Sequence, residues 1–167
     1  MSFKVDRNAA PPSSFIKTPG VYSGTIQIPK EMDCTSKGDL RIKIEFVTPS
    51  GEKVTDDYIN LESMYWKLNV LLGAADPDGT KIKILDGENL DFSQNQRFID
   101  FLKKFQDCEI SFAVFTETFT KKDGSEGTAI RVKPLDPRRG MNQLPPKARA
   151  QIEAAKLAAE GPDEVPF

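Results

Sequence analysis

The chain has 167 residues, of which 29% are charged and 38% are hydrophobic, a composition typical of one folded globular domain with tails. It contains no histidine, which excludes His-based catalytic triads and His metal sites. The formal net charge of -2 does not favour a nucleic-acid-binding protein, because such domains are usually basic.

No targeting or membrane segment stands out in the sequence. No apolar run approaches the roughly 20 residues that a membrane-spanning helix requires. The first residues also lack the apolar stretch of a secretory signal. Cys34 and Cys108 lie far apart in no paired motif, which indicates reduced thiols rather than a disulfide or a zinc site. We therefore expect a cytoplasmic protein with no membrane association.

The first half of the chain predicts three strands. Residues 1–19 include Pro11-Pro12-Ser13-Ser14 and predict a flexible arm. Residues rich in β-formers predict a strand over 21–28. Alternation of apolar and charged residues predicts a half-buried strand over 40–47, and a turn at 48–51 leads into a returning strand over 52–60.

The middle of the chain predicts two helices. The apolar spacing over 61–72 predicts a helix that ends at Gly73, and residues 82–85 predict a short strand. Ser93-Gln94-Asn95-Gln96 has the form of a capping box. Phe98, Leu102 and Phe105 follow it at helical spacing, which predicts a second helix that faces the core.

The remaining pattern predicts a long hairpin and a last helix. Over 108–120, Phe115 and Phe119 fall on the strand face opposite to the more regular apolar one, and the return strand covers 128–134. The Ala-rich segment 147–160 predicts a helix whose weak apolar stripe favours a mobile arm.

Together these elements predict a mainly β protein with an OB-fold-like, five-stranded Greek-key barrel and a helical insertion between strands 3 and 4. The predicted organisation is an arm over 1–19, the barrel over 20–137, a linker and helix over 138–160 and an acidic tail over 161–167. An OB-fold binds oligonucleotides on one sheet face that two loops flank.

The last five residues are the most informative motif. Asp163-Glu164-Val165-Pro166-Phe167 is a short acidic run that ends in Pro-Phe. A terminal Phe can fill an apolar pocket while its carboxylate and the preceding acids meet Arg or Lys at the rim. We expect Asp163, Glu164, Pro166 and Phe167 to bind a partner protein. The same tail can compete with nucleic acid for a cationic groove.

This ending resembles the tail tip of bacterial single-stranded DNA-binding proteins, and some of their phage counterparts also end in acids and Phe. Thr18-Pro19-Gly20-Val21-Tyr22, followed by Ser36-Lys37-Gly38 and an alternating strand, resembles the opening of the phage family. The resemblance implies a phage protein that acts in the host cytoplasm. It also implies coating of exposed strands in DNA replication, recombination and repair, and a tail that recruits partner enzymes.

Sequence-independent binding to single strands needs cations along the phosphates and aromatic faces on which bases stack. We expect the binding residues to lie on the outer faces of the strands and in the hairpin loop. They are Arg41, Lys43, Lys53, Tyr22, Tyr58, Phe115, Phe119, Lys121, Lys122, Arg131 and Lys133. Because large aromatic side chains dominate cores, we expect Tyr65 and Trp66 to be core residues.

Catalysis is not expected, and neither is a cofactor or a metal. The acidic clusters, such as Asp56-Asp57 and Asp76-Pro77-Asp78, lie in or beside turns, and none has the spacing of a calcium loop, a P-loop or a dinucleotide fingerprint. Two other functions stay open: a β-barrel protein-interaction module that never binds nucleic acid, and a single-stranded RNA binder. The pattern also leaves open whether the chain forms a homo-oligomer.

Overall fold

The computed structural model describes residues 15–160 together with residues 2 and 5. The predicted tail, including Asp163, Glu164, Pro166 and Phe167, lies outside the described residues, as does most of the predicted N-terminal arm.

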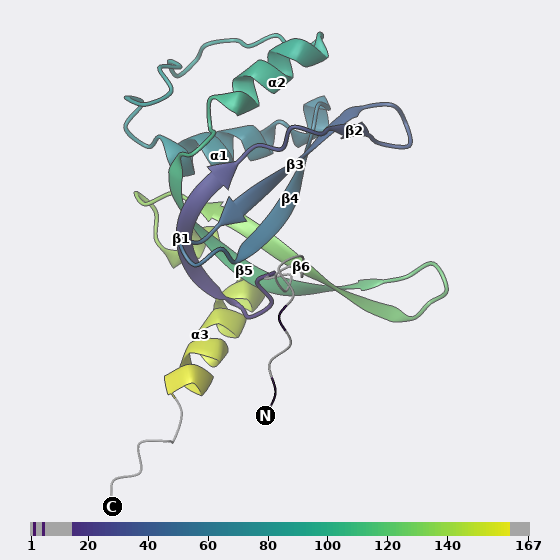
Figure 1. The fold of residues 1–167 in the computed structure, drawn as a ribbon, viewed down its shortest axis with the longest axis vertical. Helices are drawn as coiled ribbons and strands as arrows, with labels where there is room; N and C mark the ends of the chain where they lie inside the picture. Colours follow the sequence, from purple (N-terminus) through teal and green to yellow (C-terminus); the bar gives the residue numbers. More distant parts are fainter. Residues whose placement is uncertain (1, 3–4, 6–14, 161–167) are drawn as a thin grey trace, which may run out of the picture.

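The described chain is built mainly from strands, with helices after the third long strand and at the C-terminal end (Figure 1). The strands are β1 (Gly20–Gln27), β2 (Asp33–Cys34), β3 (Leu40–Val47), β4 (Lys53–Ile59), β5 (Glu109–Thr120) and β6 (Glu126–Leu135). The helices are α1 (Trp66–Ala75), α2 (Asn95–Lys103) and α3 (Pro146–Glu160), with short 3-10 helices η1 (Glu62–Met64) and η2 (Met141–Gln143).

All six strands belong to one open antiparallel sheet. β1 pairs with β5 over residues 20–25 and with β3 over residues 25–27. β3 pairs with β4 on its other edge, and β5 pairs with β6 along the whole hairpin. β4 and β6 come close to each other, but no ladder between them forms within the described residues. The sheet is therefore compatible with a β-barrel-like fold.

A glycine lets β1 change partners. At Gly24 a Cβ would lie 2.1 Å from the carbonyl oxygen of Val47 on β3. Only a hydrogen atom fits there, so the backbones of β1 and β3 approach closely just where β1 leaves one partner for the other. This contact allows the sheet to curl around its core.

The core lies inside the curl and confirms the alternation over 40–47. Ile42, Ile44 and Phe46 on β3 are fully buried, while Lys43 between them is exposed. Phe98 and Leu102 on α2 are also fully buried, as is Phe105 just after the helix, so the prediction of a core-facing second helix is confirmed as well.

The prediction that the first helix ends at Gly73 is wrong, because α1 continues to Ala75. A Cβ at Gly73 would lie 3.0 Å from a carboxylate oxygen of Asp136. The glycine thus makes room for a side chain packed against the helix rather than ending it.

Two further local predictions fail. Residues 82–85 form no strand, because the Asp76 carboxylate accepts hydrogen bonds from the backbone N–H groups of Thr80, Lys81 and Ile82 and folds this segment into a loop. The capping box at 93–96 does not form, since the N-cap of α2 is Gln94 and no side chain caps the helix.

The last helix is not a mobile arm in its first half, contrary to expectation. Ala148 and Ile152 are buried against Ala113 of β5 and Leu135 of β6. The Gln151 side chain accepts a hydrogen bond from the Thr116 N–H at 2.7 Å and donates one to the Thr116 carbonyl at 2.8 Å. The second half of α3 leads away from the sheet (Figure 1).

Among the helices of residues 15–160, none combines the length and the apolar character that crossing a membrane would require.

We expect Gly24→Ala to destabilise the protein by about 3 kcal/mol, because the added methyl group would collide with the backbone of β3. Urea unfolding followed by circular dichroism measures this. Gly140→Ala is the matched control, since no atom lies within 4 Å of its added Cβ. An unchanged unfolding midpoint for Gly24→Ala would contradict the close approach of β1 and β3.

Candidate nucleic-acid interface

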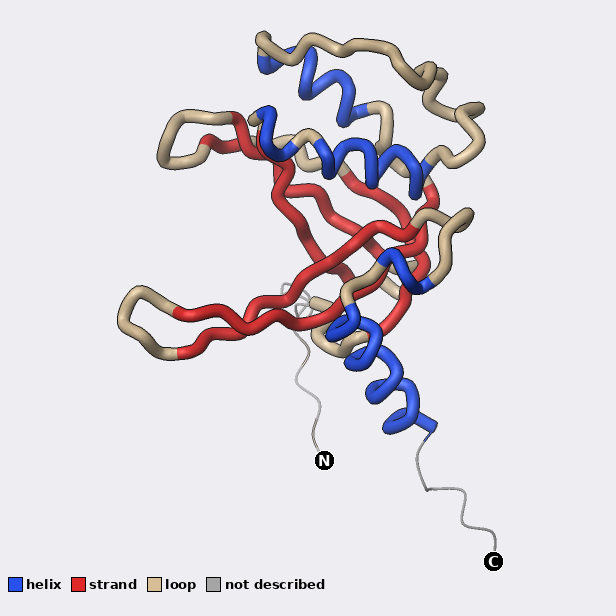
Figure 2. Tube along the Cα trace, turned by 180° about the vertical axis from the view of Figure 1, so that it is seen from behind, coloured by secondary structure: helices blue, strands red, loops and turns tan. Residues whose placement is uncertain are grey.

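Two loops project to the same side of the molecule. Figures 1 and 2 view the chain from opposite sides, and both show the connection 28–39 and the tip of the β5–β6 hairpin extending in one direction. Strand β3 begins beside the first loop and β4 ends there, while β5 leads into the second loop and β6 returns from it. Most of the predicted binding residues lie on β3, β4, β5 and β6 and in the loop between the last two strands.

The exposed face of β3 and β4 carries balanced charges. Arg41 donates two hydrogen bonds to Asp33, at 2.7 and 2.9 Å. Lys43 lies opposite Asp57 in the ladder, and Lys53 pairs with Glu45 at 2.6 Å. Each predicted cation on this face therefore has a carboxylate neighbour, and the face has little net attraction for phosphate.

The predicted aromatic residues differ in how much surface they offer. Phe119 is 45% exposed and its ring lies over Gly127 on the paired strand, where the glycine leaves space for it. Phe115 is half-buried beside the cluster that α3 covers. Phe119 is therefore the freer of the two for stacking.

Both predicted tyrosines are less exposed than Phe119. Tyr58 is only 2% exposed, and its burial raises the pKa of the phenol well above the ordinary value. Tyr58 is thus a core residue in this structure, because residue 58 falls on the inward side of β4. Tyr22 is half-buried, stacks on Phe112 with the ring centroids 5.9 Å apart and donates a hydrogen bond to the Thr18 carbonyl.

The hairpin cations are more accessible. Lys121 and Lys122 are exposed at the turn, and neither makes an ion pair within residues 15–160. Arg131 forms an exposed ion pair with Glu117 at 2.9 Å. Lys133 is half-buried and donates a hydrogen bond to the Gln143 carbonyl.

A groove of about 350 Å³ lies between α1 and the edges of β4 and β6. The expectation that Trp66 is a core residue is wrong, since its side chain is 59% exposed at the start of α1 and lines this groove. The groove joins it to Phe115, Arg131 and Lys133, residues that are 49 or more positions away in the sequence. The helical stripe of 61–72 could have indicated this, because residue 66 falls outside it.

A half-buried ion pair between Lys67 and Asp56 forms part of the wall of this groove. Lys67 contacts Asp56 at 2.9 Å, donates a hydrogen bond to the Asp57 carbonyl at 2.7 Å and lies 4.7 Å from the centroid of the Tyr58 ring. Burial raises the pKa of the Asp56 carboxyl more than the Lys67 ammonium lowers it. Lys67 thus holds α1 against the edge of β4, and its role is structural.

A second cavity of about 210 Å³ lies farther along α1 and contains two arginines that were not predicted as site residues. Arg138 holds the Asp136 carboxylate with hydrogen bonds of 3.0 Å from Nε and 2.8 Å from Nη2. Arg139 contacts the same carboxylate only at 3.9 Å, and its side chain is 74% exposed. These residues come shortly after β6, and the excess of Lys and Arg over Asp and Glu in residues 121–139 could have indicated them.

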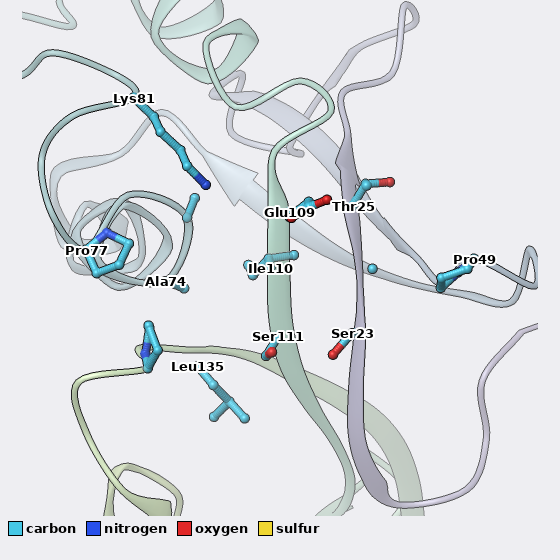
Figure 3. A pocket seen from close by; sticks show the side chains of 13 residues that line it. Ser23, Thr25, Pro49, Ala74, Pro77, Lys81, Glu109, Ile110, Ser111 and Leu135 are labelled. Atoms are coloured by element: carbon cyan, nitrogen blue, oxygen red, sulfur yellow. The ribbon is translucent and has the colours of Figure 1, made fainter.

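A further cavity, of about 520 Å³, lies outside the candidate interface. Ser23, Thr25, Glu109 and Ser111 of β1 and β5 line one side, and the C-terminal end of α1 with Pro77 lines the other (Figure 3). Within residues 15–160, no group of three His, Cys, Asp or Glu side chains could hold a metal ion, and both cysteines are free.

No protein-family model matches the chain, and no curated protein is significantly similar to it.

Asp136 should make stability depend on pH. Hydrogen bonds from Arg138 lower the pKa of its carboxyl below the ordinary value. The carboxylate therefore stabilises the fold above the unfolded-state pKa of about 4, and this stabilisation is lost as the pH falls through the lower folded-state value. Wild type should unfold at a higher urea concentration than Asp136→Asn at pH 7, and the gap should close in acid. The exposed Asp78→Asn is the control, and a gap of constant size at every pH would contradict this role.

Proposed function

We propose that the chain binds single-stranded DNA without sequence preference and protects exposed strands during replication, recombination and repair, as a phage-encoded protein of the host cytoplasm. One observation carries the proposal: exposed aromatic rings and accessible cations both lie on the hairpin and the adjoining groove. Phe119 and Trp66 supply the rings, and Lys121, Lys122 and Arg131 supply charges. Stacking and phosphate attraction are the two requirements of sequence-independent single-strand binding.

The strand pairing supports an OB-fold-like Greek-key barrel as the finer description of the fold. β1, β3, β4, β5 and β6 are then the five strands, and β1 pairs with both the second and the fourth of them. The helices α1 and α2 lie between the third and fourth strands, where an OB-fold carries its helix. The missing ladder between β4 and β6 fits a barrel that is partly open.

The exposed ion pairs do not prevent phosphate binding. A pair such as Arg131 with Glu117 contributes only about 0–1 kcal/mol at a surface. A phosphate can replace the carboxylate at little cost, and contacts to phosphate carry no base information. Bases stacked on aromatic rings then supply the preference for unpaired strands.

The C-terminal tail provides the partner-binding part of the proposed function. Asp163, Glu164, Pro166 and Phe167 recruit replication or recombination enzymes, with the terminal Phe in an apolar pocket of the partner. Between encounters, the same anionic segment competes with DNA for the cations of the interface.

A protein-interaction module is the second candidate, and the balanced charges on the β3–β4 face favour it. In that case, this face contacts another protein and the tail anchors it. A single-stranded RNA binder would use the same rings and cations, so oligo-dT and oligo-U must be compared directly.

The full-length protein should bind a labelled oligo-dT tightly in fluorescence-anisotropy titrations at low salt. Affinity should fall as salt rises, because bound phosphates release their counterions, and a matched DNA duplex should compete poorly. No binding at low salt would refute the nucleic-acid function and leave the interaction module.

Deletion of residues 163–167 should leave oligo-dT affinity unchanged or increase it, because a competing anion is removed. The comparison uses the same titration at low salt, where the competition is strongest. Replacing Asp163 and Glu164 with Asn and Gln, with Phe167 kept, isolates the charge effect. Loss of binding on truncation would contradict the competing tail.

A further inference from the structure

The two cavities beside α1 adjoin each other, and we call the surface that they form together the seam. Val70 and Lys133 line both the groove that contains Trp66 and the cavity that contains Arg139. The seam therefore follows α1 along β6, from the base of the β5–β6 hairpin to the turn after β6.

More cations than carboxylates line the seam itself, although Asp76, Asp78 and Asp86 line a cavity that adjoins it at Arg138. Five cations line the seam, against three carboxylates, while the whole chain has a net charge of -2. The cations are Lys67, Arg131, Lys133, Arg138 and Arg139. A polyanion is thus attracted to the seam more than to the balanced β3–β4 face.

The cations differ in how free they are to meet a phosphate. Lys67 and Arg138 are held by Asp56 and Asp136 through short contacts. Arg131 is paired only at the surface, and Arg139 is almost unpaired, with its single carboxylate contact at 3.9 Å. Arg131 and Arg139 therefore mark two ends of a phosphate path, with Lys133 between them.

Trp66 offers the ring at the hairpin end of the seam. It is the single tryptophan of the chain, and it takes part in none of the aromatic pairs formed within residues 15–160. Val70, Val132 and Pro134 give the adjoining groove an apolar lining. An exposed indole beside an apolar groove with a cationic rim suits a stacked base whose phosphate meets the rim.

We infer that the unpaired strand runs along the seam, with one base stacked on Trp66 and its phosphates passing Arg131 and Lys133 to reach Arg139. The inference rests on the proposed function and specifies the path of the strand: beside α1 rather than across the β3–β4 face.

The tryptophan itself provides the first test. The full-length protein is titrated with oligo-dT while labelled-strand anisotropy and intrinsic tryptophan fluorescence are followed together. Because Trp66 is the only tryptophan, its emission reports on the seam alone. Emission should be quenched in proportion to the bound fraction. Binding by anisotropy with unchanged emission would refute the seam path and leave the proposed function intact.

Substitution gives the second test. Trp66→Ala should weaken oligo-dT binding roughly 5- to 150-fold, the range for loss of one base-stacking aromatic, and Trp66→Phe should retain most of the affinity. Leu157→Ala removes an equally exposed apolar side chain on α3 and should have no effect. Because Trp66 is exposed, the variant should keep the unfolding midpoint of wild type.

The charges are tested through salt dependence. Arg139→Ala should reduce the slope of log affinity against log salt by about 0.7, the value for one phosphate contact to a single strand. Lys156→Ala, on the exposed part of α3, should leave the slope unchanged. If Arg41→Ala and Lys43→Ala reduce the slope while Arg139→Ala does not, the strand crosses the β3–β4 face and the seam path is wrong. Absence of all binding in wild type would instead refute the proposed function.

Discussion

The fold depends on the point where β1 passes from β5 to β3. β1 pairs with β5 along its first part and with β3 along its last part. Because the partner changes along one strand, the sheet curls, and its inner side chains enclose the core. Gly24 makes this possible by removing the side chain that would meet the Val47 carbonyl. The same curl brings the far edges, β4 and β6, close to each other without pairing them. The open edges are therefore a consequence of how β1 is shared.

Unpaired strand edges need cover, and here α1 supplies it. Lys67 donates to the Asp57 carbonyl on β4, while Gly73 lets α1 approach Asp136 just after β6. Covering the edges with a helix leaves a seam along the helix, and the cations of β6 and the following turn lie in it. The candidate site thus arises where α1 covers the open edges of the sheet, so the proposed binding residues lie beside those that hold the helix in place.

The sequence predicted the elements better than the surface they create. Strict alternation placed Ile42 and Ile44 in the core, and helical spacing did the same for Phe98, because these periods depend on local geometry alone. Trp66 was predicted to be a core residue and is exposed, whereas Tyr58 was predicted to be a binding residue and is buried. Burial of each depends on a distant element, α1 for the tyrosine and the open edge of the sheet for the tryptophan. The prediction that Gly73 ends the helix failed for the same reason. The glycine makes room for the side chain of Asp136, which is 63 positions away in the sequence.

A net acidic chain can still attract DNA, because screening limits electrostatics to about 8 Å at physiological salt. Within that distance, a strand on the proposed path would meet the cations that line the seam. Carboxylates elsewhere on the surface would repel duplex DNA from the other faces. The net charge of the chain therefore does not predict where a strand would bind, because that position depends on the local distribution of charges.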